Sequence, residues 1–372
     1  MAIPFIDLQA QRHRLGEPLN RAIRAAVEDG QWIMGPQVAE LEEQLAAFAG
    51  VKHCITCANG TDALMIVLRA WNIGAGDAVF VPAFTFAASA EVVALVGASP
   101  VFVDVLEDTF NMDPTSLEAA IAIVRRNGDL RPRVVMPVDL FGQPADYRAI
   151  ETIAGREKLK LLCDTAQGFG GTLDGRRTGA IGDAAATSFF PAKPLGCYGD
   201  GGAAFTNDDS LAELLRSIRI HGQGSDKYEN VRIGVNSRLD TIQAAILLEK
   251  LRIFPDEIEA REKIALSYNR LLGQSNKIRA PRTIEGAQST WAQYTIQVSD
   301  REKLQASLKD KGIPTAIYYP IPLSHQKGYR HYPSAPTAVS ERLSKNVISL
   351  PMHPYLDETT LEEITDAVLK ST

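Results

Sequence analysis

The sequence predicts an α/β protein that has a mostly parallel sheet flanked by helices and a smaller C-terminal αβ domain. The chain has 372 residues, of which 45% are hydrophobic and 23% charged, enough for two domains and a sizeable core. From residue 53 to about 220, short runs rich in Val, Ile, Phe and Ala alternate with amphipathic stretches, as in repeated strand-helix units. After residue 239 this alternation gives way to long helical patterns.

The first expected elements are two helices within residues 16–49, separated by a turn at Met34, Gly35 and Pro36. The alternating region then predicts strands and helices in turn: CITC, TDALMIVLRAW, AVFV, FAASAEVVALVG, PVFVDV, PTSLEAAIAIV, RVVMPV, ADYRAIETIAG and KLKLLCD. In a parallel sheet of this kind, ligands bind beyond the carboxyl ends of the strands.

The C-terminal part begins with long helices over residues 239–276, DTIQAAILLEKLR and IEAREKIALSYNRLL, which end near Gly273. A strand TWAQYTIQVS, a helix DREKLQASLKDKG, an extended YYPIPL segment and a last helix from about Asp357 follow. We expect a large domain over residues 1–250, which includes the N-terminal helices, and a small αβ domain over residues 251–372.

Charge and hydropathy exclude several classes of partner. A net charge of -6 gives no electrostatic basis for binding nucleic acid or an anionic membrane, so neither is expected. The N-terminus MAIPFIDLQAQRHR lacks the features of a secretory signal, and Pro82, Glu91 and Gly97 interrupt the most apolar stretch, residues 78–103. A cytoplasmic protein without a membrane segment is therefore expected.

The four cysteines, Cys54, Cys57, Cys163 and Cys197, suggest no redox or metal function. Cys54 and Cys57 have CxxC spacing, but no second CxxC or HxxxH accompanies them, and an offset of three in a strand points them to opposite faces. Buried thiols and no metal site are expected.

A candidate phosphate site lies in NGTDAL, between the strand CITC and the next helix. A helix N-terminus offers unpaired N–H groups, and Gly60 would let a phosphate approach the backbone of Thr61 and Asp62. Taken alone, this motif is better explained by an ordinary capped helix start, with Thr61 or Asp62 as the cap. Neither GxGxxG nor a Walker A motif occurs, which disfavours nicotinamide and nucleoside-triphosphate cofactors.

Two further strand ends carry polar residues. Asp164 directly follows an apolar strand, where a buried carboxylate needs a cationic partner, and Gln167 would face the same crevice. Ser188 ends the apolar run AAATSFF, and its hydroxyl would donate to the same phosphate.

Lys193 follows in a stiff loop with Pro191, Pro194 and Gly196 nearby, where a desolvated amine would form a Schiff base with a carbonyl cofactor. Turn, core and snorkelling roles are the alternatives for Asp164, Ser188 and Lys193 respectively.

These residues resemble a known family end to end. The chain is similar to the DegT/DnrJ/EryC1/StrS family of pyridoxal-phosphate-dependent nucleotide-sugar aminotransferases, which have fold type I. The matching segments are PFIDL, GPQVAELEEQLAAFAG, NGTDAL, PAFTFAASAE, DTAQGFGG, SFFPAKPLGCYGDGGA, HGQ, GVNSRLDTIQAAIL, YYPIPL and SLPMHPYL.

The resemblance implies a role for each matching position. Lys193 would bind pyridoxal 5'-phosphate covalently and move the proton between substrate and cofactor carbons, and Asp164 would pair with the pyridine nitrogen. Gln167 would approach the phenolic oxygen, and Phe86 would stack on the ring. The phosphate would bind Gly60, Thr61, Asp62 and Ser188, together with Asn236 of a neighbouring subunit, so that a homodimer shares each active site.

The resemblance also implies a substrate class. The long motifs are most similar to those of aminotransferases that act on UDP-2-acetamido-2-deoxy-3-oxo-glucuronic acid with L-glutamate as donor, on the way to a surface polysaccharide. A substrate with a diphosphate and a carboxylate needs cations, for which His221 and Arg238 are candidates, although a structural hydrogen bond and an interface salt bridge are equal alternatives. Tyr318 and Tyr319 of the YYPIPL segment are further candidates.

Two positions depart from the family pattern. Many members have His directly after the Leu of PxPL, whereas here Ser324 follows Leu323 and precedes His325. Either His325 takes that role through a small loop adjustment, or the family contact is missing. Asp139 likewise stands where many relatives have His. We expect both positions to lie in substrate-facing regions, where they would reflect a different sugar. The open alternatives are a 3-keto- or 4-keto-6-deoxy nucleotide sugar as substrate, and a non-catalytic regulatory protein with the same fold.

Overall fold

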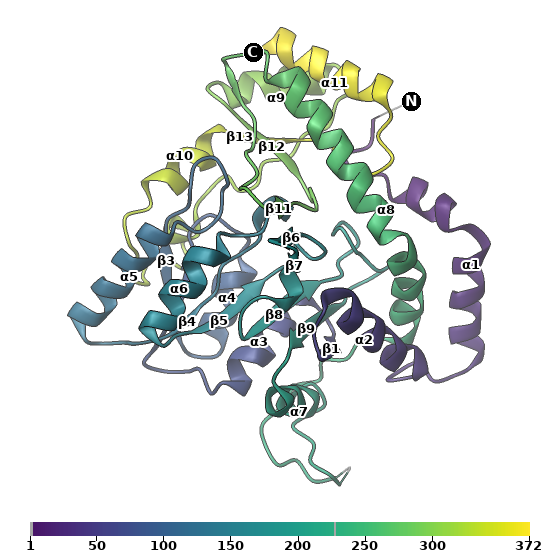
Figure 1. The fold of residues 1–372 in the computed structure, drawn as a ribbon, viewed down its shortest axis with the longest axis vertical. Helices are drawn as coiled ribbons and strands as arrows, with labels where there is room; N and C mark the ends of the chain where they lie inside the picture. The colour runs from purple at the N-terminus through teal and green to yellow at the C-terminus, as the bar shows by residue number, and fades with distance from the viewer. Residues whose placement is uncertain (1–2, 227) are drawn as a thin grey trace.

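The main sheet of the computed structural model, which describes residues 3–226 and 228–372, has seven strands in the order β1-β9-β8-β5-β4-β2-β3 (Figure 1). All neighbouring pairs are parallel except those made by β9, which is antiparallel to both β8 and β1. The predicted mostly parallel sheet is therefore confirmed. The strands are β1 (His53–Cys57), β2 (Asp77–Pro82), β3 (Ser99–Val103), β4 (Arg131–Val135), β5 (Lys160–Asp164), β8 (Ala184–Ser188) and β9 (Gly202–Thr206).

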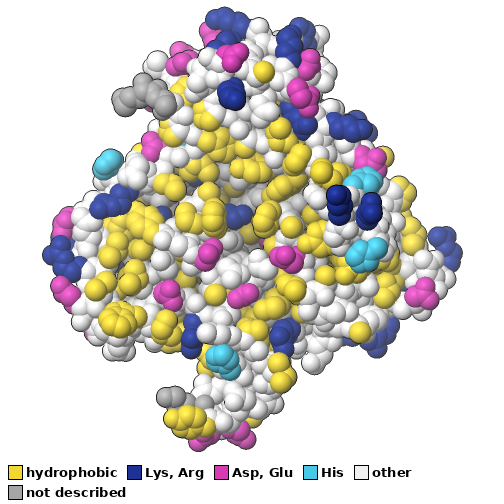
Figure 2. Space-filling view, turned by 180° about the vertical axis from the view of Figure 1, so that it is seen from behind, with side chains coloured by type: hydrophobic (Ala, Val, Ile, Leu, Met, Phe, Trp, Pro, Cys, Tyr) yellow, Lys and Arg dark blue, Asp and Glu magenta, His cyan; other side chains and the backbone are white. Residues whose placement is uncertain are grey.

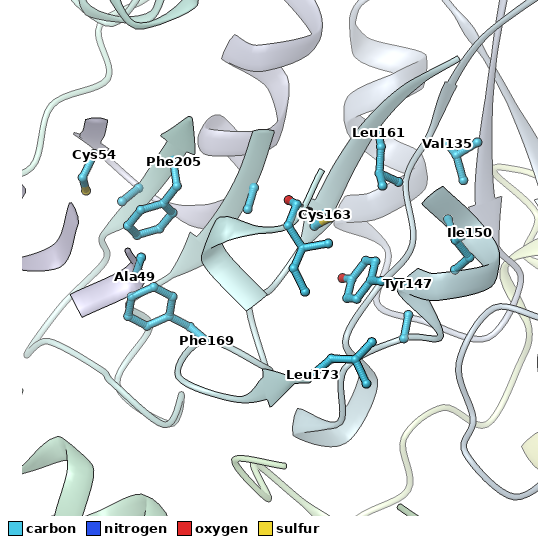
Figure 3. Packing of buried hydrophobic residues seen from close by; sticks show 14 of the residues in the cluster. Ala49, Cys54, Val135, Tyr147, Ile150, Leu161, Cys163, Phe169, Leu173 and Phe205 are labelled. Atoms are coloured by element: carbon cyan, nitrogen blue, oxygen red, sulfur yellow. Dashed lines mark hydrogen bonds between the residues drawn. The ribbon is translucent and has the colours of Figure 1, made fainter. Parts of the chain in front are cut away.

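Helices cover both faces of this sheet. One buried cluster joins the sheet to α3 (Gly60–Ala70), α4 (Ala88–Leu95) and α7 (Asp209–Ile218). A second cluster joins the opposite face to α2 (Pro36–Ala49), α5 (Pro114–Asn127), α6 (Tyr147–Glu157) and α8 (Thr241–Leu272). Figure 3 shows part of this second cluster, where the rings of Phe169 and Phe205 stack with centroids 5.1 Å apart.

The cysteines follow the expected strand geometry. Cys54 belongs to one cluster and Cys57 to the other, as their spacing predicts. All four thiols are buried and free.

The N-terminal helices differ slightly from the prediction. The first, α1 (Leu8–Glu28), begins eight residues earlier than expected, because the side chain of Asp7 caps it by accepting a hydrogen bond from the N–H of Ala10 over 2.8 Å. Gly16, with φ of 54°, interrupts its helical geometry. The turn before α2 lies at Met34–Pro36 as predicted, because Pro36 starts α2.

The stretch that predicted two long helices forms the single helix α8, which continues through Pro255. Its first half packs in the cluster under the main sheet, and its last turns pack in the C-terminal core. Packing on both sides of the proline outweighs the loss of one backbone hydrogen bond. Residue 250 lies inside α8, and the division into two domains stays a prediction.

The C-terminal part is an antiparallel sheet covered by helices. Its strand order is β10-β12-β13, and a separate small sheet has the order β11-β6-β7. The predicted strand, helix and last helix correspond to β12, α9 and α11, whereas α10 and β13 were not predicted. The bounds are β6 (Thr172–Leu173), β7 (Arg176–Arg177), β10 (Ile278–Arg279), β11 (Ala287–Gln288), β12 (Tyr294–Val298), α9 (Arg301–Asp310), α10 (Ala338–Asn346), β13 (Val347–Leu350) and α11 (Glu358–Ser371).

Within residues 3–226 and 228–372, no helix has a stretch sufficiently apolar and long to span a membrane.

Candidate active site

Three predicted site positions meet at one edge of the main sheet. Asp164 at the end of β5 pairs with Ala186 in β8, and Ser188 at the end of β8 pairs with Gly202 in β9. Gly202 also pairs with Cys57, the last residue of β1, so the loop that starts α3 reaches the same edge. Strand register thus brings together residues that are distant in the sequence.

The N-terminus of α3 forms an open donor site beside Ser188. Asn59, rather than the expected Thr61 or Asp62, caps the helix by accepting the Asp62 N–H over 2.8 Å, because its extended backbone turns its side chain over the first turn. The N–H groups of Gly60 and Thr61 have no acceptor among the described residues. These donors at the positive end of a helix suit a phosphate.

Gly60 is required there by close packing. A Cβ at this position would lie 2.6 Å from Cβ and 3.2 Å from Oγ of Ser188. The Ser188 hydroxyl oxygen accepts the N–H of Phe190 over 3.3 Å, so its proton is free to donate to a ligand. The donor set therefore fits the phosphate of the implied cofactor.

Asp164 is a buried carboxylate whose charge is only partly satisfied. It is 5% exposed, and it accepts hydrogen bonds from the Ser89 hydroxyl over 2.9 Å and from the Ala166 N–H over 3.2 Å. Burial raises the pKa of Asp164, and the two hydrogen bonds and the charge of Lys193 oppose that rise. A protonated ring nitrogen would supply the missing cationic partner.

Lys193 lies in the loop between β8 and β9. Burial lowers the pKa of its amine, and the charge of Asp164 works in the opposite direction. The amine has no hydrogen-bond or salt-bridge partner within the described parts of the chain, whereas its backbone N–H donates to the Phe190 carbonyl over 2.8 Å. Such an amine is disposed to react as the neutral nucleophile.

Aromatic rings and an amide complete this group. Phe86 is 56% exposed, and its ring centroid lies 6.2 Å from that of Tyr319. Gln167 donates from Nε2 to the Tyr319 hydroxyl over 3.2 Å and accepts the Phe141 N–H over 2.6 Å. The Tyr318 ring lies 5.7 Å from that of Tyr319, so both predicted tyrosines belong to this wall.

His221, Asn236 and Arg238 form a separate group. The described residues that carry them, 219–226 and 228–238, follow the end of α7 and extend away from the main sheet before returning to it (Figure 1). His221 and Arg238 line an open hollow together with Met34, and Asn236 is exposed. The neighbouring Ser237 links this segment to the α3 loop, because its Oγ accepts the Ala58 N–H over 3.1 Å.

His325 and Asp139 have different surroundings. His325 is half exposed, with its Nε2 3.6 Å from Oε1 of Glu341. The expectation that Asp139 faces substrate is wrong, because its side chain is fully buried and accepts hydrogen bonds from the Tyr147 hydroxyl over 2.7 Å and from the Ala145 N–H over 3.0 Å.

Sequence patterns did not reveal every residue of this group. Ser89 lies within the apolar helix α4, 75 residues before Asp164, and only the folded arrangement brings its hydroxyl to the carboxylate.

Comparison with known proteins gives consistent matches over the whole chain. The family model described as the DegT/DnrJ/EryC1/StrS aminotransferase family matches residues 13–369. The chain is 48% identical over 366 residues to the UDP-2-acetamido-2-deoxy-3-oxo-D-glucuronate aminotransferase of Pseudomonas aeruginosa, with 98% of this chain and 99% of the relative covered. It is 38% identical to the dTDP-3-amino-3,6-dideoxy-alpha-D-galactopyranose transaminase of Aneurinibacillus thermoaerophilus, with 98% of each covered.

Solved structures agree with the sequence matches. A DegT DnrJ EryC1 StrS aminotransferase from Brucella abortus superposes with a TM-score of 0.97 at 54% identity, covering 99% of both chains. NtdA from Bacillus subtilis, with the cofactor PMP bound, superposes with a TM-score of 0.89 at 28% identity, covering 99% of this chain and 83% of NtdA.

Proposed function

Because the chain belongs to the DegT/DnrJ/EryC1/StrS aminotransferase family, we propose that it is a transaminase that uses pyridoxal 5'-phosphate to aminate a nucleotide sugar. The proposed substrate is UDP-2-acetamido-2-deoxy-3-oxo-D-glucuronic acid, whose C3 ketone becomes an amine. L-glutamate donates the amino group and leaves as 2-oxoglutarate. The substrate assignment is supported by 48% identity to the Pseudomonas aeruginosa enzyme over nearly the full length of both chains.

The observation that carries the chemistry is the meeting of a low-pKa amine, a buried carboxylate and an open helix N-terminus at one sheet edge. When bound, the cofactor supplies an electron sink that stabilises a carbanion next to the transferred nitrogen. Lys193 would hold the cofactor covalently and carry the proton between carbon atoms. Asp164 would hold the proton on the pyridine nitrogen.

The remaining residues of the group would bind and orient the cofactor. Phe86, with its exposed ring, would stack on one face of the pyridine, and Gln167 would approach the phenolic oxygen. The phosphate would bind the N-terminal turn of α3 and the hydroxyl of Ser188, through residues Gly60, Thr61, Asp62 and Ser188.

A homodimer with shared active sites is part of the proposal. The turn before α2 exposes three large hydrophobic side chains, Trp32 (57%), Ile33 (48%) and Met34 (41%), and hydrophobic side chains spread over much of the face in Figure 2. This turn lies beside Arg238, because Met34 and Arg238 line the same hollow. The N–H of Thr241 also donates to the Trp32 carbonyl over 2.9 Å. Covering this apolar turn with a second copy would favour association.

The partner subunit would complete the site. Asn236 would reach the phosphate of the neighbouring cofactor, and His221 and Arg238 would meet the substrate's anionic groups, with Tyr318, Tyr319 and His325 as further substrate contacts. We place this activity in the cytoplasm, where the 3-amino sugar would be made for O-antigen or another lipopolysaccharide.

The second candidate substrate is a 6-deoxy keto sugar. The Aneurinibacillus thermoaerophilus relative, named for a dTDP-linked 3-amino-3,6-dideoxy sugar, supports it at 38% identity. Such a sugar lacks the C6 carboxylate, so its binding site needs one cationic side chain fewer.

One assay separates these possibilities. The purified protein, loaded with pyridoxal phosphate, is offered L-glutamate with either the UDP-linked 3-oxo-uronic acid or a dTDP-linked 3-keto-6-deoxy sugar, and 2-oxoglutarate is measured. Glutamate alone releases at most one equivalent of 2-oxoglutarate per enzyme, so release here means release beyond that equivalent. We expect such release with the uronic acid, loss of release in Lys193→Ala, and no change in Lys263→Ala, an exposed lysine of α8. Release with the 6-deoxy sugar alone would favour the second substrate. A protein that forms no Lys193-dependent visible absorbance band would overturn the proposal and favour a regulatory role.

A further inference from the structure

A second lysine contacts the loop that carries Lys193. Lys250 of α8 is 1% exposed, and its ammonium donates a hydrogen bond of 2.5 Å to the carbonyl oxygen of Gly196, three residues after Lys193. The same ammonium lies 4.4 Å from the ring centroid of Tyr198, within the range of a cation–π contact.

α8 holds the loop at another point. Gln243, two turns before Lys250 on the same face of the helix, accepts the backbone N–H of Tyr198 at its Oε1 over 2.8 Å. A Cβ on Gly199 would lie 3.0 Å from Nε2 of Gln243, so the glycine permits this close approach. Two polar side chains of one rigid helix therefore fix the loop on the C-terminal side of Lys193.

The loop itself is tightly folded at the point that Lys250 contacts. The N–H of Cys197 donates to the Phe189 carbonyl over 2.8 Å. A Cβ at Gly196 would lie 2.5 Å from the Pro191 carbonyl oxygen, so only glycine fits. A displacement of the Gly196 carbonyl would consequently be transmitted to Lys193 across a short, stiff segment.

Packing alone does not account for a lysine at position 250. Burying an ammonium is unfavourable, and burial lowers the pKa of Lys250 to about 8. A methionine would fill a similar volume without this penalty. The two directed contacts to Gly196 and Tyr198 are what the ammonium adds.

We propose that Lys250 is a positioning residue that sets the location of the Lys193 amine by holding the Gly196 carbonyl, with Gln243 as a second support. This inference rests on the proposed function, because the position of the loop matters only if Lys193 reacts with the cofactor. Lys250 would touch neither cofactor nor substrate.

The test compares covalent and non-covalent cofactor binding in the full-length Lys250→Met variant. Apo-protein is mixed with pyridoxal phosphate, and capture by Lys193 is followed by absorbance and by borohydride reduction with peptide mass analysis. Affinity for pyridoxamine 5'-phosphate, which has the same ring and phosphate but forms no bond to lysine, is measured in parallel. Lys263→Met, on the exposed face of the same helix, is the control.

We expect Lys250→Met to slow capture about tenfold, since small misplacements of a reacting group reduce rates strongly. Its affinity for pyridoxamine phosphate and its apo-protein Tm should stay close to wild type. Gln243→Met should slow capture less, by about threefold. If Lys250→Met does not fold, the same measurement on Gln243→Met tests the proposal.

The outcomes are distinguishable. Capture at the wild-type rate, or an equal loss of both kinds of binding together with Tm, would overturn the positioning role and indicate a purely structural one. A wild-type protein that captures no pyridoxal phosphate at Lys193 would instead overturn the proposed function, and this inference with it.

Discussion

The hydroxyl of Ser89 in α4 donates a hydrogen bond of 2.9 Å to Oδ2 of Asp164, at the end of β5. Both side chains are buried, with Ser89 at 0% and Asp164 at 5% exposure. The bond favours the ionised carboxylate against the burial that raises its pKa. Ser89 therefore supports the charge on which the proposed chemistry depends.

Removing this hydroxyl should shift the pH dependence of activity. In Ser89→Ala the pKa of Asp164 rises further, so the carboxylate gains its proton at a higher pH than in wild type. We expect kcat/KM at neutral pH to fall about tenfold, the value of a hydrogen bond to a charged group, and the acidic limb of its pH profile to move upward. Ser210→Ala, on the exposed side of α7, is the control; an unmoved acidic limb would contradict the assignment.

The amine of Lys193 should react at lower pH than an ordinary lysine. Burial lowers its pKa, and only the neutral amine attacks a carbonyl, so the rate of pyridoxal phosphate capture should rise with a midpoint below about 10.4. Asp164→Asn removes the negative charge that raises the pKa of Lys193, so the pH midpoint of capture should be lower still in this variant. Stopped-flow absorbance across a pH series measures both midpoints, and a midpoint at the value of free lysine would refute the prediction.

Replacing Gly60, the glycine beside Ser188, should weaken phosphate binding. Gly60→Ala places a Cβ 2.6 Å from the Ser188 Cβ, which forces the α3 N-terminus and Ser188 apart. We expect the Kd for pyridoxamine phosphate to rise about tenfold or more, since two donors are misaligned at about 1 kcal/mol each. Gly155→Ala in α6, where a Cβ meets nothing within 4 Å, should leave the Kd unchanged. Equal Kd values for both variants would exclude a phosphate site at Gly60.

The sequence predicted those parts of the site that local patterns encode. Asp164 and Ser188 are recognisable because each polar residue directly ends an apolar strand, and Gly60 because it starts a helix after a strand. Ser89 and Lys250 have no such signal, since their partners lie 75 and 54 residues away and depend on how helices pack.

The errors have the same origin in tertiary packing. The segments within residues 239–276 predicted two helices, but contacts of Phe254 and Ile258 with the main core keep α8 continuous through Pro255. Asp139 suggested a substrate contact because it stands where many relatives have His, yet the hydroxyl of Tyr147 from α6 fixes its carboxylate inside the core. Neither contact is visible in a local sequence window.

The buried carboxyl of Asp139 should make stability depend on pH. Burial raises its pKa to about 7. The folded chain therefore keeps a proton that the unfolded chain releases above about pH 4, so this group reduces stability as pH rises from about 4 to about 7. An asparagine at this position would still accept hydrogen bonds from the Tyr147 hydroxyl and the Ala145 N–H, but it would not titrate.

We therefore expect the unfolding free energy of Asp139→Asn, relative to wild type, to increase across that pH range and to level off above it. Urea unfolding at pH 5, 6, 7 and 8 measures the difference, and Asp310→Asn, at an exposed position in α9, is the control. Because Oδ2 of Asp139 has no hydrogen-bond partner among the described residues, no lost bond at that atom offsets the gain. A difference that stays constant with pH would show that Asp139 is ionised in the folded protein throughout the range, and that an unseen donor stabilises its charge.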